Sequence, residues 1–244
     1  MNTIIQSLFD RKSVRAFEER LICAEDKRLI LTAAMEAPTA GNQQMYTILD
    51  ITDQKLKETL ADTCDHQPFI AKAPLVLIFC ADQQKWYDAF VEGGAEPRKP
   101  REGDLILAIE DTLIAAQNAV VAAESLGIGS CYIGDILENC EIHRELLNLP
   151  QYVVPVGMVV FGYPTQQQKE RQKPQRCRLE DIVQENRYVR RDGAALRRMF
   201  DKETRTKSYE EWCQAFCKRK FNSDFSREMS RSAAEYLKAF QDEA

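Results

Sequence analysis

The chain has 244 residues, 44% hydrophobic and 29% charged, which is enough apolar material for an ordinary folded core. Its formal net charge of -5 argues against a nucleic-acid partner, because a polyanion is normally bound by a net basic face. The longest apolar run, Val153 to Phe161, is too short to span a bilayer. The N-terminus also lacks a signal-peptide pattern, so we expect a cytoplasmic protein with no membrane partner.

The cysteines and histidines do not follow the spacing of a metal site. Eight cysteines are scattered along the chain without a CxxC motif, and free thiols are therefore expected. Cys213 and Cys217 share a helix face, but no second pair of ligands follows them, and their role is left open. His66 and His143 are not at ligand spacing, and no GxSxG motif is present. We expect neither a metal centre nor a triad hydrolase.

Hydrophobic periodicity and turn residues predict helices interspersed with short strands. The predicted elements, in chain order, are a helix from Thr3 to Asp10, a helix from Glu25 to Ala37, a strand from Tyr46 to Ile51, a helix from Asp53 to Thr63 capped by Asp53, a strand from Pro74 to Cys80, a mobile loop from Glu92 to Gly103, a helix from Asp104 to Leu126, a strand from Ser130 to Ile133, a helix from Ile142 to Leu147 and a strand from Val153 to Gly162.

The predicted helix from Asp104 to Leu126 is apolar on more than one face, which suits the centre of a domain or a dimer interface. Beyond Tyr188 the chain becomes charged, helical and rich in aromatic residues, over Ala194 to Lys220 and Phe225 to Phe240. Helices outweigh strands without regular alternation, which indicates an α+β fold. We expect a main domain over residues 1–186 and a helical C-terminal extension over 187–244.

Four sequence clusters carry the functional argument. They are the basic run RKSVR at 11–15, the segment APTAGNQQ at 37–44, the glycine-rich GIGSCYIGD at 127–135, and GYP with KPQR and LEDIV at 162–183. The glycines of the third cluster do not form a dinucleotide-binding fingerprint, because a helix precedes them and a strand follows them.

Together, in this order, the four clusters resemble the FMN-dependent nitroreductase family as far as about Val183. The resemblance implies an α+β fold with a mixed sheet flanked by helices, a homodimer, and FMN at the interface of the two chains. The YIGD form of the third cluster is similar to the branch of the family that has a glycine beside the flavin ring.

The resemblance also assigns residues to the cofactor. Phosphate and ribityl contacts would come from the first cluster, ring contacts near N5 from the third, and a second phosphate pair from the fourth. The second cluster would line the cofactor from the other chain. KPQR is one residue longer than the usual K-x-R, which favours Arg176 over Lys173. The residues implied to bind the cofactor are Arg11, Lys12, Ser13, Arg15, Thr39, Asn42, Gln44, Ile133, Gly134, Lys173 and Arg176.

Physical chemistry agrees with this set. The FMN phosphate needs fixed cations, and arginine offers a planar donor fork that matches its oxygens. A cation at Arg15 would favour the negative charge that a reduced flavin gathers near N1 and the C2 carbonyl. No catalytic side chain is expected, because the chemistry takes place at the flavin N5.

The resemblance implies an oxidoreductase that passes electrons from NADH or NADPH through FMN to nitroaromatic, quinone or related small acceptors. Without a dinucleotide fold, donor and acceptor would use one flavin face in turn, which predicts ping-pong kinetics. Two alternatives are left open: an FMN-binding storage or sensor protein without useful turnover, and a specialised member such as a reductive dehalogenase. We further expect the C-terminal extension to be a dimer arm.

Overall fold

The computed structural model describes residues 1–201 and 207–241. The chain divides into two compact units, one formed by Met1–Arg171 with Met229–Ala244 and the other by Gln172–Glu228. The predicted division between residues 186 and 187 therefore falls within the second unit.

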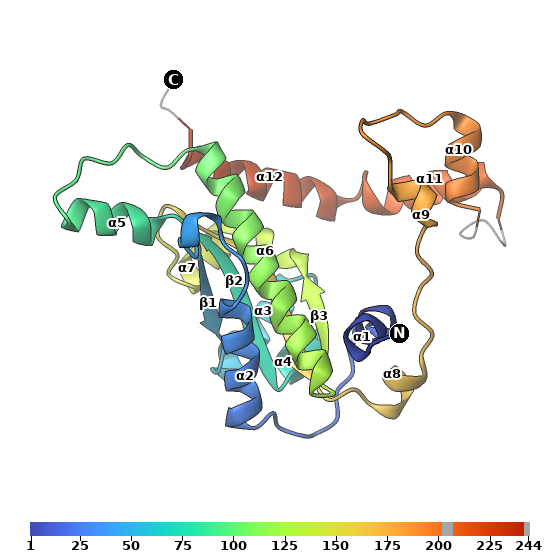
Figure 1. The fold of residues 1–244 in the computed structure, drawn as a ribbon, viewed down its shortest axis with the longest axis horizontal. Coiled ribbons are helices and arrows are strands. Elements are labelled where there is room, and N and C mark those ends of the chain that lie inside the picture. The colour runs from blue at the N-terminus through green and yellow to red at the C-terminus, as the bar shows by residue number, and fades with distance from the viewer. Residues whose placement is uncertain (202–206, 242–244) are drawn as a thin grey trace. The chain divides into compact units, whose positions relative to one another are not determined.

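The first unit holds the sheet and most of the helices (Figure 1). Its elements are α1 (Thr3–Asp10), α2 (Ala24–Met35), the 3-10 turn η1 (Ala40–Asn42), β1 (Tyr46–Asp50), α3 (Gln54–Thr63), α4 (Phe69–Lys72), β2 (Leu75–Asp82), α5 (Gln84–Glu92), α6 (Glu102–Ser125), β3 (Gly129–Ile133), the 3-10 turn η2 (Gly134–Leu137), α7 (Cys140–Leu146), β4 (Val153–Gly162) and α8 (Gln166–Glu170). The second unit holds α9 (Leu179–Ile182), α10 (Gly193–Met199) and α11 (Tyr209–Lys220), and α12 (Asp224–Lys238) begins in it and continues into the first.

The four strands form one sheet in the order β1-β2-β4-β3. Each neighbouring pair of strands is antiparallel. The sheet is therefore antiparallel rather than mixed, which differs from what the resemblance implied. The parallel pairing found among the described residues is an isolated bridge between Ser13 and Ser130, beside β3. The α+β class of the fold is confirmed.

Strand β2 explains the layering, because both of its faces are buried. Leu75, Leu77 and Phe79 pack in a cluster with residues of α2 and α6. The alternate residues Val76, Ile78 and Cys80 pack in another cluster with residues of α3 and α4. Since successive side chains of a strand point to opposite faces, helices cover the sheet on both sides. This burial is the reason why the segment reads as a continuous apolar run.

Helix α6 crosses the face of the sheet, with α2 beside it (Figure 1). By length and composition alone it is apolar enough to span a membrane. Small residues on one side of it, among them Ala116, Ala119 and Ala123, are fully buried with β2 and β4 in one core cluster. This is the packing of a central core helix.

The end of the chain belongs to the core of the first unit. Tyr236 and Phe240 are buried in a cluster that includes Met45 and Tyr152, and the rings of Phe240 and Tyr152 have centroids 5.6 Å apart. This part of the predicted extension therefore packs on its own subunit.

In the second unit, the aromatic residues of α11 pack on one another. Trp212 lies between Phe200 and Phe216, with ring centroids 5.2 Å away on each side. These residues, Phe200 at the end of α10 and the two rings of α11, therefore act as packing anchors, as predicted for the aromatic residues of this region.

The ends of the predicted strands and long helices agree with the structure to within two residues. Helix α5 was not predicted, and the segment after it, 93–101, is the irregular part of the predicted loop. Asp53 caps α3 as predicted, because its carboxylate accepts the Leu56 N–H at 2.7 Å.

His143 is a fully buried core histidine rather than a ligand or a base. Its Nδ1 lies 2.9 Å from the carbonyl oxygen of Ile136 and its Nε2 lies 2.8 Å from the hydroxyl of Thr63. A neutral ring donates to the first and accepts from the second. Burial lowers the pKa of His143, which favours the neutral ring in the folded state.

This environment predicts an acid-side loss of stability. A histidine whose folded pKa is lowered contributes its full stability above the unfolded value near 6.5, and loses it as the pH falls below that value. One such proton gives a slope of up to about 1.4 kcal/mol per pH unit. We expect His143→Gln to remove this slope between pH 6.5 and pH 5 in urea unfolding, whatever its effect at neutral pH.

The matched control is His66→Gln, because the His66 side chain is 82% exposed. This variant should keep the parent slope. If His143→Gln and the parent protein lose stability equally on acidification, the buried neutral histidine is not the cause.

Candidate functional site

The basic segment 11–15 is fixed alongside strand β3. Val14 N donates to the carbonyl oxygen of Ser130 at 2.9 Å, next to the Ser13–Ser130 bridge. Glu18 N then donates to the carbonyl of Tyr163 at 2.8 Å, which holds the chain against the end of β4. The first and third sequence clusters are thus brought together, as the predicted site requires.

Two glycines allow this close approach. Gly129 and Gly162 are register partners on β3 and β4. A Cβ atom on Gly129 would lie 2.6 Å from Val14 Cγ2, and one on Gly162 would lie 2.6 Å from Phe17 Cδ1. No real Cβ fits at these distances, so residues 14–17 can pack on the two strands only because both positions are glycines. We call this contact the glycine seat. Sequence reasoning gave these glycines no role in packing.

The cations of this segment differ in their surroundings. Lys12 Nζ donates to the carbonyl oxygens of Lys169 at 2.7 Å and Arg171 at 2.5 Å, so it helps hold the chain together. Arg11 is half-buried, and its Nε is buried without a hydrogen-bond partner in the described part of the chain. The Arg15 side chain is exposed.

Sequence reasoning missed Arg171. Its guanidinium donates to the carbonyl oxygen of Ser13 at 2.5 Å, while its Nε is buried without a partner among the described residues. Arg171 thus adds a further cation to the basic segment from a position 158 residues away. The charged run KER at 169–171 could have indicated an additional cation, but no local pattern in it predicts a contact with Ser13.

The cations of the basic segment affect the pKa values of two side chains on β3. Burial raises the pKa of Tyr132 to about 12, while the charge of Arg11 opposes the rise. Burial also raises the pKa of the Cys131 thiol, against the lowering effect of Arg15, a hydrogen bond with Ser13, and Arg11. The positive potential of the basic segment therefore reaches the middle of β3.

Strand β3 ends at an open position. Ile133 is buried, and Gly134, the first residue of η2, is exposed. A Cβ on Gly134 would meet nothing within 4 Å, and the backbone there is not left-handed. Unlike Gly129, Gly134 is therefore not needed for packing within the chain, and its surface is free to contact a flat ligand.

The second cluster is anchored to α6 by Asp111, which is only 3% exposed. Its carboxylate accepts hydrogen bonds from the Thr39 hydroxyl, from Ala40 N at 3.0 Å and from Met45 N at 3.3 Å. Sequence reasoning missed Asp111, because its partners lie 66 to 72 residues away.

The anchored loop has an unusual backbone. Gly41, Asn42 and Gln44 all have positive φ angles, of 59°, 57° and 49°. Gln44 N donates to the Thr39 hydroxyl at 2.7 Å, while Asn42 is exposed. The predicted residues Thr39 and Gln44 thus hold the loop in shape, and Asn42 faces solvent.

The predicted site residues of the first unit fall on two edges of the sheet. The segment 39–44 leads into β1, whereas Ser13 and Gly134 adjoin β3. In the order β1-β2-β4-β3 these are the opposite edge strands, and three strand spacings amount to roughly 14 Å. Lys173 and Arg176 belong to the second unit, where Arg176 is exposed.

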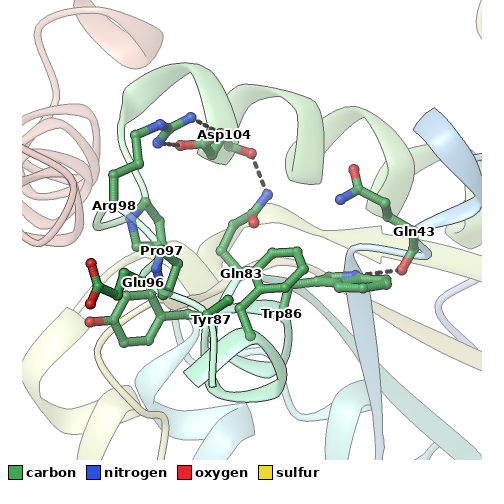
Figure 2. A pocket seen from close by; sticks show the side chains of 11 residues that line it. Gln43, Gln83, Trp86, Tyr87, Glu96, Pro97, Arg98 and Asp104 are labelled. Atoms are coloured by element: carbon green, nitrogen blue, oxygen red, sulfur yellow. Dashed lines mark hydrogen bonds and ion pairs between the residues drawn. The ribbon is translucent and has the colours of Figure 1, made fainter. Parts of the chain in front are cut away.

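Two neighbouring pockets lie next to the 39–44 loop. One has a volume of about 340 Å³ and is lined by Asn42, Gln44 and Lys85 among others. The second, of about 390 Å³, shares Gln43 and Trp86 with the first (Figure 2). Lys85, from α5, was not predicted: its Nζ donates to the Tyr46 carbonyl at 2.8 Å, and burial lowers its pKa.

Comparison with known proteins identifies the family. The model of the nitroreductase family matches residues 8–163, and the chain therefore belongs to that family. The sequence is 29% identical over 238 residues to an FMN reductase [NAD(P)H] of Bacillus subtilis, covering 97% of this chain and 91% of the relative. It is 32% identical over 198 residues to an oxygen-insensitive NADPH nitroreductase of Salmonella typhimurium, covering 81% and 80%.

Solved structures agree with the fold. NfrA2 of B. megaterium superposes with a TM-score of 0.83 at 25% identity over all of both chains. The NADPH:FMN oxidoreductase of Vibrio harveyi complexed with NAD+ has a TM-score of 0.82 at 24% identity, over 97% of this chain and 98% of the other. The resemblance predicted from the four sequence clusters is confirmed, and so is the nitroreductase-like fold.

A substitution at Gly129 tests whether its packing contact with Val14 fixes the basic segment on β3. We expect Gly129→Ala to lower the free energy of unfolding by about 1–3 kcal/mol, because it overpacks against Val14. Val14→Ala should recover part of this loss in the double variant. The measurement is a double-mutant cycle by urea unfolding.

Gly103→Ala is the control, since a Cβ there meets nothing within 4 Å. If Val14→Ala costs the same in the parent and in Gly129→Ala, the two residues are not coupled and the seat is not what fixes the segment.

Proposed function

We propose that the chain binds FMN and passes electrons from NADH or NADPH to nitroaromatic, quinone or related small acceptors. It is an NAD(P)H-dependent FMN oxidoreductase of the nitroreductase family. The observation that carries the proposal is the basic segment 11–15, fixed by its backbone on β3 beside the open surface of Gly134. The names of the two curated relatives support it.

The residues present fit the phosphate end of FMN. Arg11 has a buried Nε without a partner among the described residues, and a phosphate oxygen is the type of acceptor that it lacks. Arg15 adds an exposed cation and Ser13 a hydroxyl donor. Lys12 contributes charge, although two carbonyl oxygens already bind its ammonium group. We assign Lys173 and Arg176 to the same phosphate, with Arg176 the more important.

The ring end of FMN fits the region where β3 ends. Backbone groups of Ile133 and Gly134 would hold the ring, and Gly134 leaves room for a flat surface. Bound FMN supplies two-electron chemistry between the nicotinamide and the acceptor. The side chains of this protein bind and orient the reactants, and we assign no catalytic side chain.

A complete site needs two copies of the chain. The family resemblance implies that Thr39, Asn42 and Gln44 line the FMN held by a second copy, and their position toward the β1 edge, opposite the basic segment, supports this assignment. Helix α6 also carries exposed apolar side chains with helical spacing, which a homodimer interface would cover. These are Ile106, Leu107, Leu113 and Ile114. We extend the proposal to residues 187–228 as an arm that reaches the partner.

The kinetic mechanism follows because the electron donor and the acceptor share one binding site. Donor and acceptor bind in turn where the ring is exposed, which gives ping-pong kinetics. We place this activity in the cytoplasm. Rapid turnover distinguishes this function from that of an FMN storage or sensor protein, and acceptor profiling distinguishes it from a reductive dehalogenase.

The proposal is tested by the visible spectrum of the purified protein. We expect a yellow protein whose released cofactor is FMN rather than FAD, because the site has cations for one phosphate and no dinucleotide fold. Adding NADH or NADPH without oxygen should bleach the flavin, and a quinone should restore the colour. Bound FAD, no flavin after reconstitution, or a flavin that NAD(P)H does not reduce would contradict the proposed function.

The phosphate assignment is tested with Arg11→Ala. A hydrogen bond to a charged group contributes about 1.5–3 kcal/mol, so FMN binding should weaken by roughly 10- to 150-fold. Riboflavin has no phosphate, and its weaker binding should change little. Titrations of flavin fluorescence measure both ligands.

The matched control is Arg28→Ala, which removes the same charge from an exposed position on α2. It should leave both affinities nearly unchanged. An equal loss of FMN and riboflavin affinity in Arg11→Ala would show that Arg11 acts on the fold rather than on the phosphate.

A further inference from the structure

Two cysteine side chains of helix α11, Cys213 and Cys217, have no part in the proposed flavin chemistry. Both carry free thiols, and Cys213 is half-buried whereas Cys217 is exposed. Because they are four residues apart, the helix places them one turn apart on the same face. The sequence alone left their role open, since two thiols cannot complete a four-ligand centre.

The helix that carries the two thiols is fixed at its start and along one side. Ser208 and Glu211 form a capping box at its first turn. The rings of Trp212 and Phe216, each one residue before a cysteine, stack with centroids 5.2 Å apart. The spacing of the two thiols is therefore set by a packed helix rather than by a loop.

Polar groups lie on both sides of the thiol pair. A hydrogen bond with the Cys213 thiol is the main reason why the pKa of Tyr209 is raised. At the other end, Asn222 Nδ2 donates to Cys217 Sγ at 3.6 Å. The acidic residues of α11 are confined to its first turn, whereas three basic residues directly follow Cys217. The surroundings of the pair therefore favour negative charge on sulfur.

The helical spacing suits a bridging metal ion better than a disulfide. Side chains four residues apart have Cβ atoms roughly 5–6 Å apart, whereas a disulfide needs a Cβ separation of about 3.5–4.5 Å. Two thiolates on opposite sides of one metal ion, each bound at about 2.3 Å, have sulfur atoms about 4.6 Å apart. An intact helix can therefore hold the ion, but it would have to distort to form the disulfide.

The number of ligands selects the kind of ion. Within the part of the chain that the structure describes, no third cysteine, histidine, aspartate or glutamate joins the pair to make a larger metal-binding group. Zn²⁺ normally takes four ligands. Cu⁺ is a soft ion that prefers sulfur, and two thiolates are enough to bind it.

We propose that Cys213 and Cys217 form a two-thiolate site for a soft monovalent metal ion, Cu⁺. On binding, each thiol loses its proton to solvent and forms a Cu–S bond, and the copper remains monovalent. The site then carries one net negative charge, which the basic last turn of α11 offsets. No residue assigned to FMN contributes to it, so this site is independent of the proposed function.

The test uses the full chain with Cys23→Ser and Cys177→Ser, because the remaining cysteines outside the pair are buried. Cu⁺ is supplied without oxygen as its acetonitrile complex, in competition with a coloured Cu⁺ chelator. We expect one tightly held Cu⁺ per chain, an ultraviolet thiolate-to-copper absorption band and a release of protons. Cys217→Ser should weaken binding by roughly 100-fold or more, because the second Cu–S bond no longer forms within one molecule.

The matched control moves one thiol and keeps their number. Cys217→Ser combined with Ala215→Cys leaves two thiols on α11 at a spacing of two residues, and side chains at that spacing do not face each other. Ala215 is exposed, so the exchange should leave the fold intact. This variant should bind Cu⁺ as weakly as Cys217→Ser does.

Weaker copper binding in both variants, with unchanged circular dichroism and flavin content, would support the site. Equal Cu⁺ affinity in the two variants and the parent would overturn it. A folded protein that forms an internal disulfide with oxidised glutathione, and binds no copper when reduced, would assign the pair to redox chemistry and overturn the proposal. Trypsin cleavage after Lys207 and Lys218 leaves both cysteines in one peptide, so mass spectrometry detects this bond.

Copper binding does not require the flavin, so the two proposals fail separately. Tight, Cys217-dependent binding of Cu⁺ in a protein that takes up no FMN would support the copper site and contradict the proposed function. A yellow protein whose flavin NAD(P)H bleaches, but which does not hold Cu⁺ more tightly than Cys217→Ser, would overturn the copper site alone.

Discussion

The geometry of the cofactor region depends on one close contact, the packing of residues 14–17 on the glycine pair of β3 and β4. A Cβ atom on either Gly129 or Gly162 would approach the side chain above it to 2.6 Å. Because the strand backbones are bare at these two positions, the N-terminal segment can pair with Ser130 and Tyr163 through its own backbone. The cations of the segment are therefore placed by main-chain hydrogen bonds, which leaves the side chains of Arg11 and Arg15 available to a ligand, whereas Lys12 is bound by two carbonyl oxygens.

At the other edge of the sheet, a buried carboxylate fixes the 39–44 loop. Asp111 lies on the central helix and binds three donors from Thr39, Ala40 and Met45. A buried charge needs such partners, because leaving it without them costs several kcal/mol. The bonds in turn hold the loop in a backbone with positive φ at Asn42 and Gln44. Both segments that we assign to the flavin are thus shaped by groups outside the proposed set of cofactor-binding residues.

The sequence predicts what is set locally and misses what is set by contacts between distant residues. Asp53 could be recognised as a cap, and β2 as a buried strand, because their signals lie within a few residues. Asp111 and Arg171 act on partners 66 or more residues away, and no local pattern reveals these partners. The glycines show the same limit: Gly129 serves packing and Gly134 is open, although both stand in one motif. Helix α5 was missed because its N-cap residue, Gln83, makes no side-chain capping bond, and the carboxylate that accepts the Lys85 N–H belongs to Asp82, the last residue of β2.

The two edges of the sheet offer different chemistry, and neither is sufficient alone. The β3 edge has cations and an open glycine but no aromatic wall among the residues that form it. The β1 edge has the pocket that Trp86 and Tyr87 of α5 line. Arg98, which also lines this pocket, is already paired with Asp104. In the proposed site, both the phosphate and the ring of FMN lie along the β3 edge, and the loop at the β1 edge covers the cofactor of another copy. One copy places these two edges roughly 14 Å apart on one sheet, and this separation is consistent with our proposal that the 39–44 loop serves the FMN of a second copy.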